Sequence, residues 1–68
     1  MRIIIKIENE EYKSGFLEGN AEELSETMYE NVDKIGRYKM ELENGDMIVI
    51  GKDAIQRARF IFTDSEAL

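Results

Sequence analysis

The feature that most constrains the fold of this chain is the absence of both cysteine and histidine from its 68 residues. A chain of this length buries only about 60% of the surface that its unfolded form exposes, so small domains are often stabilised by disulfides, metal ions or self-association. Disulfides and ordinary zinc sites need the two residue types that are missing here. We therefore expect one domain over residues 1–63, held by its own apolar core or by further copies, and a frayed tail over residues 64–68.

The first half of the chain predicts a β-hairpin followed by a helix. Residues 1–7 are rich in β-branched side chains, and residues 12–18 return as a second strand after a polar turn over residues 8–11. Within that second strand, Gly15 suggests a bulge or a close backbone approach. Asn20 is a suitable N-cap, Glu23 stands where a capping box needs an acid, and Gly36 can end the helix. The helix, over residues 21–34, is indicated by an apolar stripe whose members recur every three or four residues: Ala21, Leu24, Met28, Val32 and Ile35.

The second half predicts three more strands. Residues 37–43 alternate between apolar and charged side chains, and Asn44-Gly45 predicts a type I′ hairpin turn into a return strand over residues 46–50. Asp53 can cap a single helical turn over residues 54–57, and residues 59–63 form the last strand. The order is ββαββ(short helical turn)β. We therefore predict a two-layer α+β domain, with one helix packed on a mostly antiparallel sheet of four or five strands.

This order of elements, together with the chain length, resembles the β-grasp or ubiquitin-like proteins. The resemblance implies a β-grasp-like arrangement as one form of the predicted fold, and other one-helix sheets with the same order stay open. Conjugation of the ubiquitin kind is not expected, because the sequence ends in Ser65-Glu66-Ala67-Leu68 rather than in a Gly-Gly pair.

Two predicted strands are apolar on both faces. Ile4 alternates with Ile3 and Ile5, and residues 47–50 are apolar throughout. A single helix can cover only one face of a sheet, and strands that are apolar on both sides usually have both faces buried. We therefore expect a homodimer or a higher oligomer, and a structural subunit of a larger assembly is one function that fits. The alternative is a modest exposed patch, or a face shielded by the tail.

The residue types present exclude much catalytic chemistry. Without histidine and cysteine, neither a Ser-His-Asp nor a Cys-His arrangement can form. A pair of carboxylates needs a cleft that a one-helix domain hardly provides. The segment from Gly45 to Gly51-Lys52 does not match the spacing of a phosphate-binding loop, and the nearby acids do not follow calcium-loop spacing. We expect no enzymatic activity, no catalytic residue, no cofactor and no metal site.

The strongest functional signal is acidic. Residues 8–33 hold nine carboxylates and one lysine, although the whole chain has a net charge of only −6. Such a field repels nucleic acid and anionic membranes and favours a basic protein surface. We expect a binding module that docks on a basic protein surface, as an inhibitor that mimics nucleic-acid charge would, of the kind that some viruses make; a merely solvated acidic face is the alternative. The predicted contacts lie on the outer face of the helix, with Tyr29 as an aromatic anchor: Glu22, Glu26, Tyr29, Glu30 and Asp33.

A second interpretation uses the C-terminal half, which is slightly basic. Lys52, Arg57 and Arg59 can converge beside the short helical turn and bind a small anionic ligand such as a nucleotide. This would be an oligomeric ligand-binding protein rather than a docking module. The longest apolar run, Ile3–Ile5, is too short for a membrane span or a signal-peptide core, so a cytoplasmic location is expected.

Overall fold

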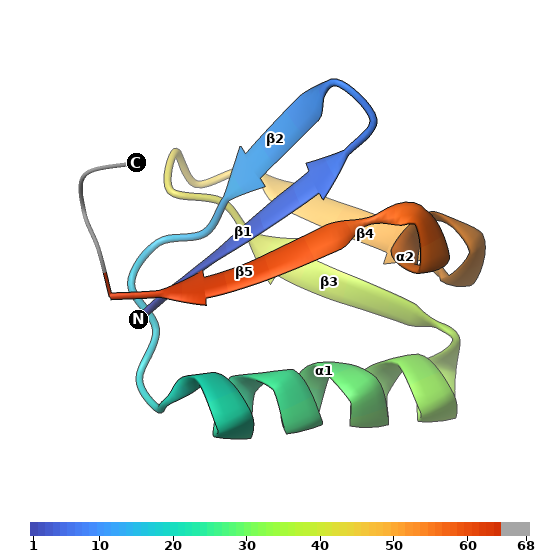
Figure 1. The fold of residues 1–68 in the computed structure, drawn as a ribbon, viewed down its shortest axis with the longest axis horizontal. Coiled ribbons are helices and arrows are strands. Elements are labelled where there is room, and N and C mark those ends of the chain that lie inside the picture. The colour runs from blue at the N-terminus through green and yellow to red at the C-terminus, as the bar shows by residue number, and fades with distance from the viewer. Residues whose placement is uncertain (65–68) are drawn as a thin grey trace.

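The strands and helices follow one another in the predicted order. The structure is a computed structural model that describes residues 1–64. Within these residues the chain forms five strands and two helices, and Figure 1 shows how they are arranged. The predicted α+β class is confirmed. The elements are β1 (Arg2–Ile7), β2 (Glu10–Lys13), α1 (Ala21–Ile35), β3 (Arg37–Glu41), β4 (Met47–Gly51), α2 (Lys52–Arg57) and β5 (Arg59–Thr63).

The five strands form two antiparallel sheets rather than one. β1 lies between β2 and β5 in a three-stranded sheet, and β3 pairs with β4 in a separate ribbon. An isolated antiparallel bridge between Ser14 and Leu42 joins the end of β2 to the ribbon. The resemblance to β-grasp proteins is therefore one of element order. Figure 1 shows α1 running below both sheets, so that one helix covers the space between them.

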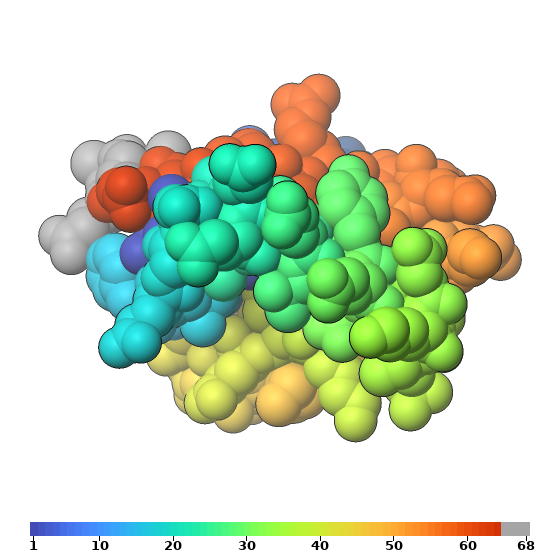
Figure 2. Space-filling model, turned by 90° about the horizontal axis from the view of Figure 1, so that it is seen from below, coloured from blue at the N-terminus to red at the C-terminus, as the bar shows by residue number. Residues whose placement is uncertain are grey.

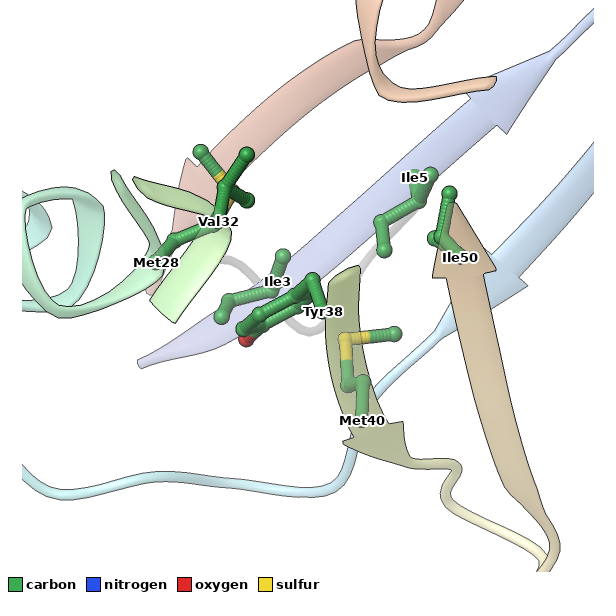
Figure 3. Close-up of a cluster of buried hydrophobic side chains, with 7 residues drawn as sticks. All are labelled: Ile3, Ile5, Met28, Val32, Tyr38, Met40 and Ile50. Atoms are coloured by element: carbon green, nitrogen blue, oxygen red, sulfur yellow. The ribbon is translucent and has the colours of Figure 1, made fainter. Parts of the chain in front are cut away.

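The core lies where the two sheets and α1 meet. It is built from both sheets and from the inner side of α1, and Figure 3 shows these side chains converging: Ile3, Ile5, Met28, Val32, Tyr38, Met40 and Ile50. Burial raises the pKa of the Tyr38 hydroxyl. Leu24 packs at the edge of this core, whereas Ile35 is 55% exposed at the last position of the helix. The predicted apolar stripe is thus confirmed at Leu24, Met28 and Val32, whereas Ala21 is half-buried outside this cluster and Ile35 is exposed.

Both ends of α1 are capped as the sequence predicts. The side-chain oxygen of Asn20 accepts a hydrogen bond from the backbone N–H of Glu23 at 2.9 Å. At the other end, Gly36 adopts a φ of 78° and donates its N–H to the carbonyl of Val32 at 2.8 Å. Left-handed backbone of this kind suits glycine, which has no Cβ to clash. These local contacts fix the helix within one residue of the predicted range.

The second strand ends earlier than predicted, because Ser14 takes the chain out of the sheet. Its hydroxyl accepts a hydrogen bond from the N–H of Ile3 and donates one to the carbonyl of Gly15, both at 2.8 Å. The side chain thus replaces a backbone partner in the ladder, and residues 15–20 form a connection instead of the predicted strand. The space around Gly15 is open, so the close approach expected there is wrong.

Two turns differ from the predictions. The hairpin at Asn44-Gly45 is confirmed, but its loop is longer than a two-residue type I′ turn: the N–H of Gly45 donates to the carbonyl of Leu42 at 3.0 Å, and only Gly45 has a positive φ there. The Asn44 side chain instead accepts from the backbone N–H of Asp46 at 2.9 Å. The short helix α2 starts at Lys52, and its N-cap is Gly51 rather than Asp53.

The second face of β1 is buried without help from another copy. Ile3, Ile4 and Ile5 are only 1%, 2% and 0% exposed. Ile4 lies between Lys13 of β2 and Ile61 of β5, outside the main core. These three residues are therefore buried within a single chain and do not by themselves require a second copy, while the homodimer stays a prediction. The residues paired with Ile4 are an isoleucine and a lysine, and a lysine stem can cover apolar surface.

The outer face of β4 remains exposed. Ile50 is buried and Ile48 packs against the core, whereas Met47 and Val49 are 60% and 54% exposed. An interface between copies on this strand would thus involve Met47 and Val49. Of the predicted tail, Asp64 is exposed and lies 3.5 Å from the amino group of Met1; residues 65–68 lie outside the described residues.

Candidate protein-docking site

The outer side of α1 carries the acidic residues that the sequence singles out. Met28 and Val32 face the core, so residues offset by about half a turn point to solvent. Figure 2 looks onto this outer side of α1. We call the following exposed residues the acidic face: Glu22, Glu26, Tyr29, Glu30 and Asp33.

The carboxylates of the acidic face have no cationic partner within residues 1–64. Lys34 is suitably spaced to pair with Glu30, and Arg37 with Asp33, but neither ion pair is formed within residues 1–64. The ion pairs of the described chain lie elsewhere, with N–O distances of 3.1–3.7 Å: Met1–Asp64, Arg2–Glu43, Lys6–Glu11, Lys13–Glu11 and Arg57–Glu8. Part of the charge on and beside the strands is therefore neutralised, whereas the outer carboxylates of α1 have no cationic partner within residues 1–64.

Tyr29 stands at the border of this acidic face. Its side chain is 62% exposed. A ring packed at the edge of the helix would be hidden from solvent to a larger extent. An exposed aromatic ring between carboxylates combines apolar contact area with charge, and such residues are enriched where interfaces carry most binding energy.

The connection into α1 is held against β1. The amino group of Met1 donates to the carbonyl of Leu17 at 3.0 Å, and the N–H of Leu17 donates back to Met1 at 2.6 Å. Nearby, the Arg2 guanidinium lies 4.6 Å from the centre of the Phe16 ring and 3.3 Å from Glu43. These contacts fix where the helix starts, and therefore where its outer face points.

The basic residues of the second interpretation are only partly brought together. Arg57 and Arg59 line an open pocket of about 410 Å³ with Lys6, Glu8 and Ala58, and Lys52 is not part of it. Glu8 already pairs with Arg57 at 3.1 Å. Sequence reasoning missed Lys6, because it becomes a neighbour of Arg59 only through the antiparallel register of β1 and β5.

Two residues of the first hairpin have unusual properties without forming a reactive site: Tyr12 has a raised pKa, and Glu8 has an unusual backbone conformation. The Tyr12 hydroxyl donates to the carboxylate of Glu10, and this hydrogen bond is the main cause that raises the pKa of Tyr12. Glu8 adopts a φ of 55° at the tip of the first hairpin, a conformation that side chains with a Cβ rarely adopt. Both features belong to the β1–β2 hairpin and lie outside the acidic face.

Comparison with known proteins identifies no relative. No family model, curated protein or solved structure matches the chain at a significant level. Within residues 1–64, acidic side chains do not gather in a group that could hold a metal ion, and neither helix has the length and apolar character needed to cross a membrane.

Proposed function

We propose that this chain is a small, non-catalytic binding module of the cytoplasm that docks its acidic face on a basic surface of another protein. Glu22, Glu26, Glu30 and Asp33 supply the electrostatic contacts, and Tyr29 is the aromatic anchor. The observation that carries this proposal is the contrast in ion pairing: the described acids on and beside the strands have cationic partners in several places, and those of the acidic face have none.

The geometry of α1 supports a partner that normally holds nucleic acid. Glu22 and Asp33 are eleven positions apart, which corresponds to about 16 Å along a helix axis. Four carboxylates lie along this line. One strand of DNA carries about five phosphates over the same axial distance, so the two charge densities are similar. A basic groove would thus be occupied by α1, and the module would act as an inhibitor of nucleic-acid binding. Long-range attraction would also speed the encounter.

The test reverses the charge of the acidic face. A tagged chain with Glu22→Lys and Glu26→Lys should lose a basic protein that the unaltered chain retains at low salt, since each replacement turns an attraction into a repulsion. The matched control is Glu41→Lys with Asp53→Lys, which changes the net charge equally outside α1 and should retain the partner. The proposal fails if the partner stays bound to the charge-reversed chain, or if 0.5 M NaCl does not release it from the unaltered one.

If a partner is found, its own nucleic-acid binding decides between plain docking and inhibition. Adding the unaltered chain should release a labelled oligonucleotide from the partner, and the charge-reversed chain should not. Release by neither chain would leave docking in place and remove the inhibitor role.

A second candidate function rests on the pocket between β1 and β5. Because Lys6, Arg57 and Arg59 line one open pocket, a small anion such as a nucleotide could bind there and displace Glu8 from Arg57. A ligand present at 100 times its Kd stabilises a protein by about 2.7 kcal/mol. Thermal melting with a panel of nucleotides therefore tests this candidate, with Arg59→Ala as the variant that should lose the shift and Lys52→Ala as the control that should keep it.

A further inference from the structure

The β3–β4 ribbon has an outer face that no other element of the described chain covers. Alternation along β3 places Arg37, Lys39 and Glu41 on this side, and all three are exposed. On β4 the same side carries Met47 and Val49, both more than half exposed. The register places Val49 opposite Lys39 and Met47 opposite Glu41. We call these five residues the ribbon face.

The ribbon face continues onto the end of α1. Ile35, Arg37 and Lys39 line a shallow pocket of about 160 Å³ together with Asn31. Arg37 and Lys39 thus lie between two exposed apolar groups, with Ile35 beside them in this pocket and Val49 opposite Lys39 on β4. Neither Arg37 nor Lys39 forms an ion pair within residues 1–64. An apolar centre beside unpaired cations is the pattern of an interface for an acidic partner.

We propose that the ribbon face accepts the acidic face of a second copy of this chain. The complementarity is specific. The acidic face offers an exposed ring, Tyr29, for the apolar centre, and flanking carboxylates for Arg37 and Lys39. This inference uses the docking surface of the proposed function and adds that one of its occupants is the protein itself.

The contact is heterologous, since two different surfaces meet. Each copy that uses its acidic face keeps a free ribbon face, so association is head-to-tail and can extend beyond a dimer. The surfaces are small, and interfaces that bury less than about 1,200 Å² are usually weak. Self-association therefore occupies the acidic face only at high concentrations of the chain. A basic partner that binds the acidic face with higher affinity displaces the second copy.

The test uses two variants that each damage one surface. Glu26→Gln with Glu30→Gln removes the two central carboxylates of the acidic face, and Arg37→Glu with Lys39→Glu reverses the two basic charges of the ribbon face. Sedimentation of the unaltered chain from micromolar to millimolar concentration in 0.15 M NaCl should show a rising mean mass. At this salt the Debye length is about 8 Å, so the net charge of whole molecules is largely screened while contacting pairs are not. Each variant alone should associate at least tenfold more weakly.

Mixing the two variants gives the decisive result. The intact acidic face of one variant can bind the intact ribbon face of the other, so an equimolar mixture should form heterodimers that do not grow further. The inference is overturned if the unaltered chain stays monomeric, if both variants associate like the unaltered chain, or if the mixture stays monomeric. Circular dichroism of each variant verifies that these exposed substitutions leave the fold intact.

The same variants separate this inference from the proposed function. The chain with Arg37→Glu and Lys39→Glu should still capture a basic partner, because its acidic face is unchanged. Partner capture without self-association would overturn the inference alone. Self-association without partner capture would overturn the proposed function alone.

Discussion

Replacing Glu26 by lysine tests whether the acidic face costs the protein stability. Glu26 lies four positions after Glu22 and four before Glu30, and these exposed carboxylates have no cationic partner within residues 1–64. Like charges at this spacing destabilise a helix by about 0.2–0.5 kcal/mol per pair, and opposite charges stabilise it by a similar amount. Glu26→Lys turns two repulsive pairs into two attractive ones. Because the introduced lysine precedes Glu30, which is the less favourable orientation of such a pair, we expect the free energy of unfolding to rise by about 0.6–1.5 kcal/mol.

Urea unfolding followed by circular dichroism measures this change. Glu26→Gln removes the repulsion without adding attraction and should give about two thirds of the gain. Glu41→Lys is the control for the change in net charge. Glu41 is exposed on β3, so it takes no part in the repulsion between carboxylates spaced four positions apart on α1. In 1 M NaCl the Debye length falls to about 3 Å, so the gain should shrink. An unchanged or lower midpoint for Glu26→Lys, or a gain that salt does not alter, would refute the reasoning.

Three further predictions concern the scaffold. Ser14→Ala removes the acceptor of the buried Ile3 N–H and should lower the free energy of unfolding by about 1–3 kcal/mol. Ser25→Ala removes only a solvent-exposed hydrogen bond to the carbonyl of Glu22 and should change it by less than about 0.5 kcal/mol; equal urea midpoints for the two variants would contradict this. The raised pKa of Tyr38 means that the native state keeps the proton longer than the unfolded state, so its contribution is complete below pH ~10 and is lost as the pH rises through the higher native value. Melting temperatures should fall less steeply above pH ~10 in Tyr38→Phe than in the unaltered chain, and parallel curves would refute the assignment. Glu8→Gly relieves the strain of a positive φ of 55° and should raise the free energy of unfolding by up to about 1 kcal/mol, which would be seen as a higher melting temperature. A lower melting temperature would mean that losing the exposed ion pair with Arg57 costs more stability than the backbone strain does.

Local signals in the sequence predict the helix and most strands well. Asn20, Glu23 and Gly36 cap α1 through contacts within a few residues, so no knowledge of the rest of the fold is needed. The alternation of Tyr38 and Met40 with charged neighbours likewise defines β3, because its period depends only on the strand itself.

Long-range pairing is what the sequence does not reveal. The division into two sheets depends on Ser14, whose hydroxyl bonds to a strand eleven positions away and whose backbone meets Leu42. Nothing in the local pattern distinguishes this serine from a surface one. The burial of Ile4 is likewise not visible in the local pattern, since Ile4 pairs with Lys13 of β2 and with Ile61 of the last strand.

The candidate site divides in a similar way. The period of α1 predicts that its carboxylates lie on the outside, because that follows from the position of Met28 and Val32. Their lack of ion pairs was not predicted, since Lys34 and Arg37 have suitable spacing to Glu30 and Asp33 but do not reach them. The pocket that joins Lys6 to Arg57 and Arg59 requires the register of β1 and β5 and could not be found from composition.

The central claim is that the acidic face holds a basic protein, and native mass spectrometry of the chain purified gently from its source at low salt tests it most directly. The account predicts a complex with a basic protein that dissociates as salt is raised and is absent for the chain with Glu22→Lys and Glu26→Lys. A chain that carries only a bound small molecule, or a protein complex unaffected by both salt and charge reversal, would contradict it.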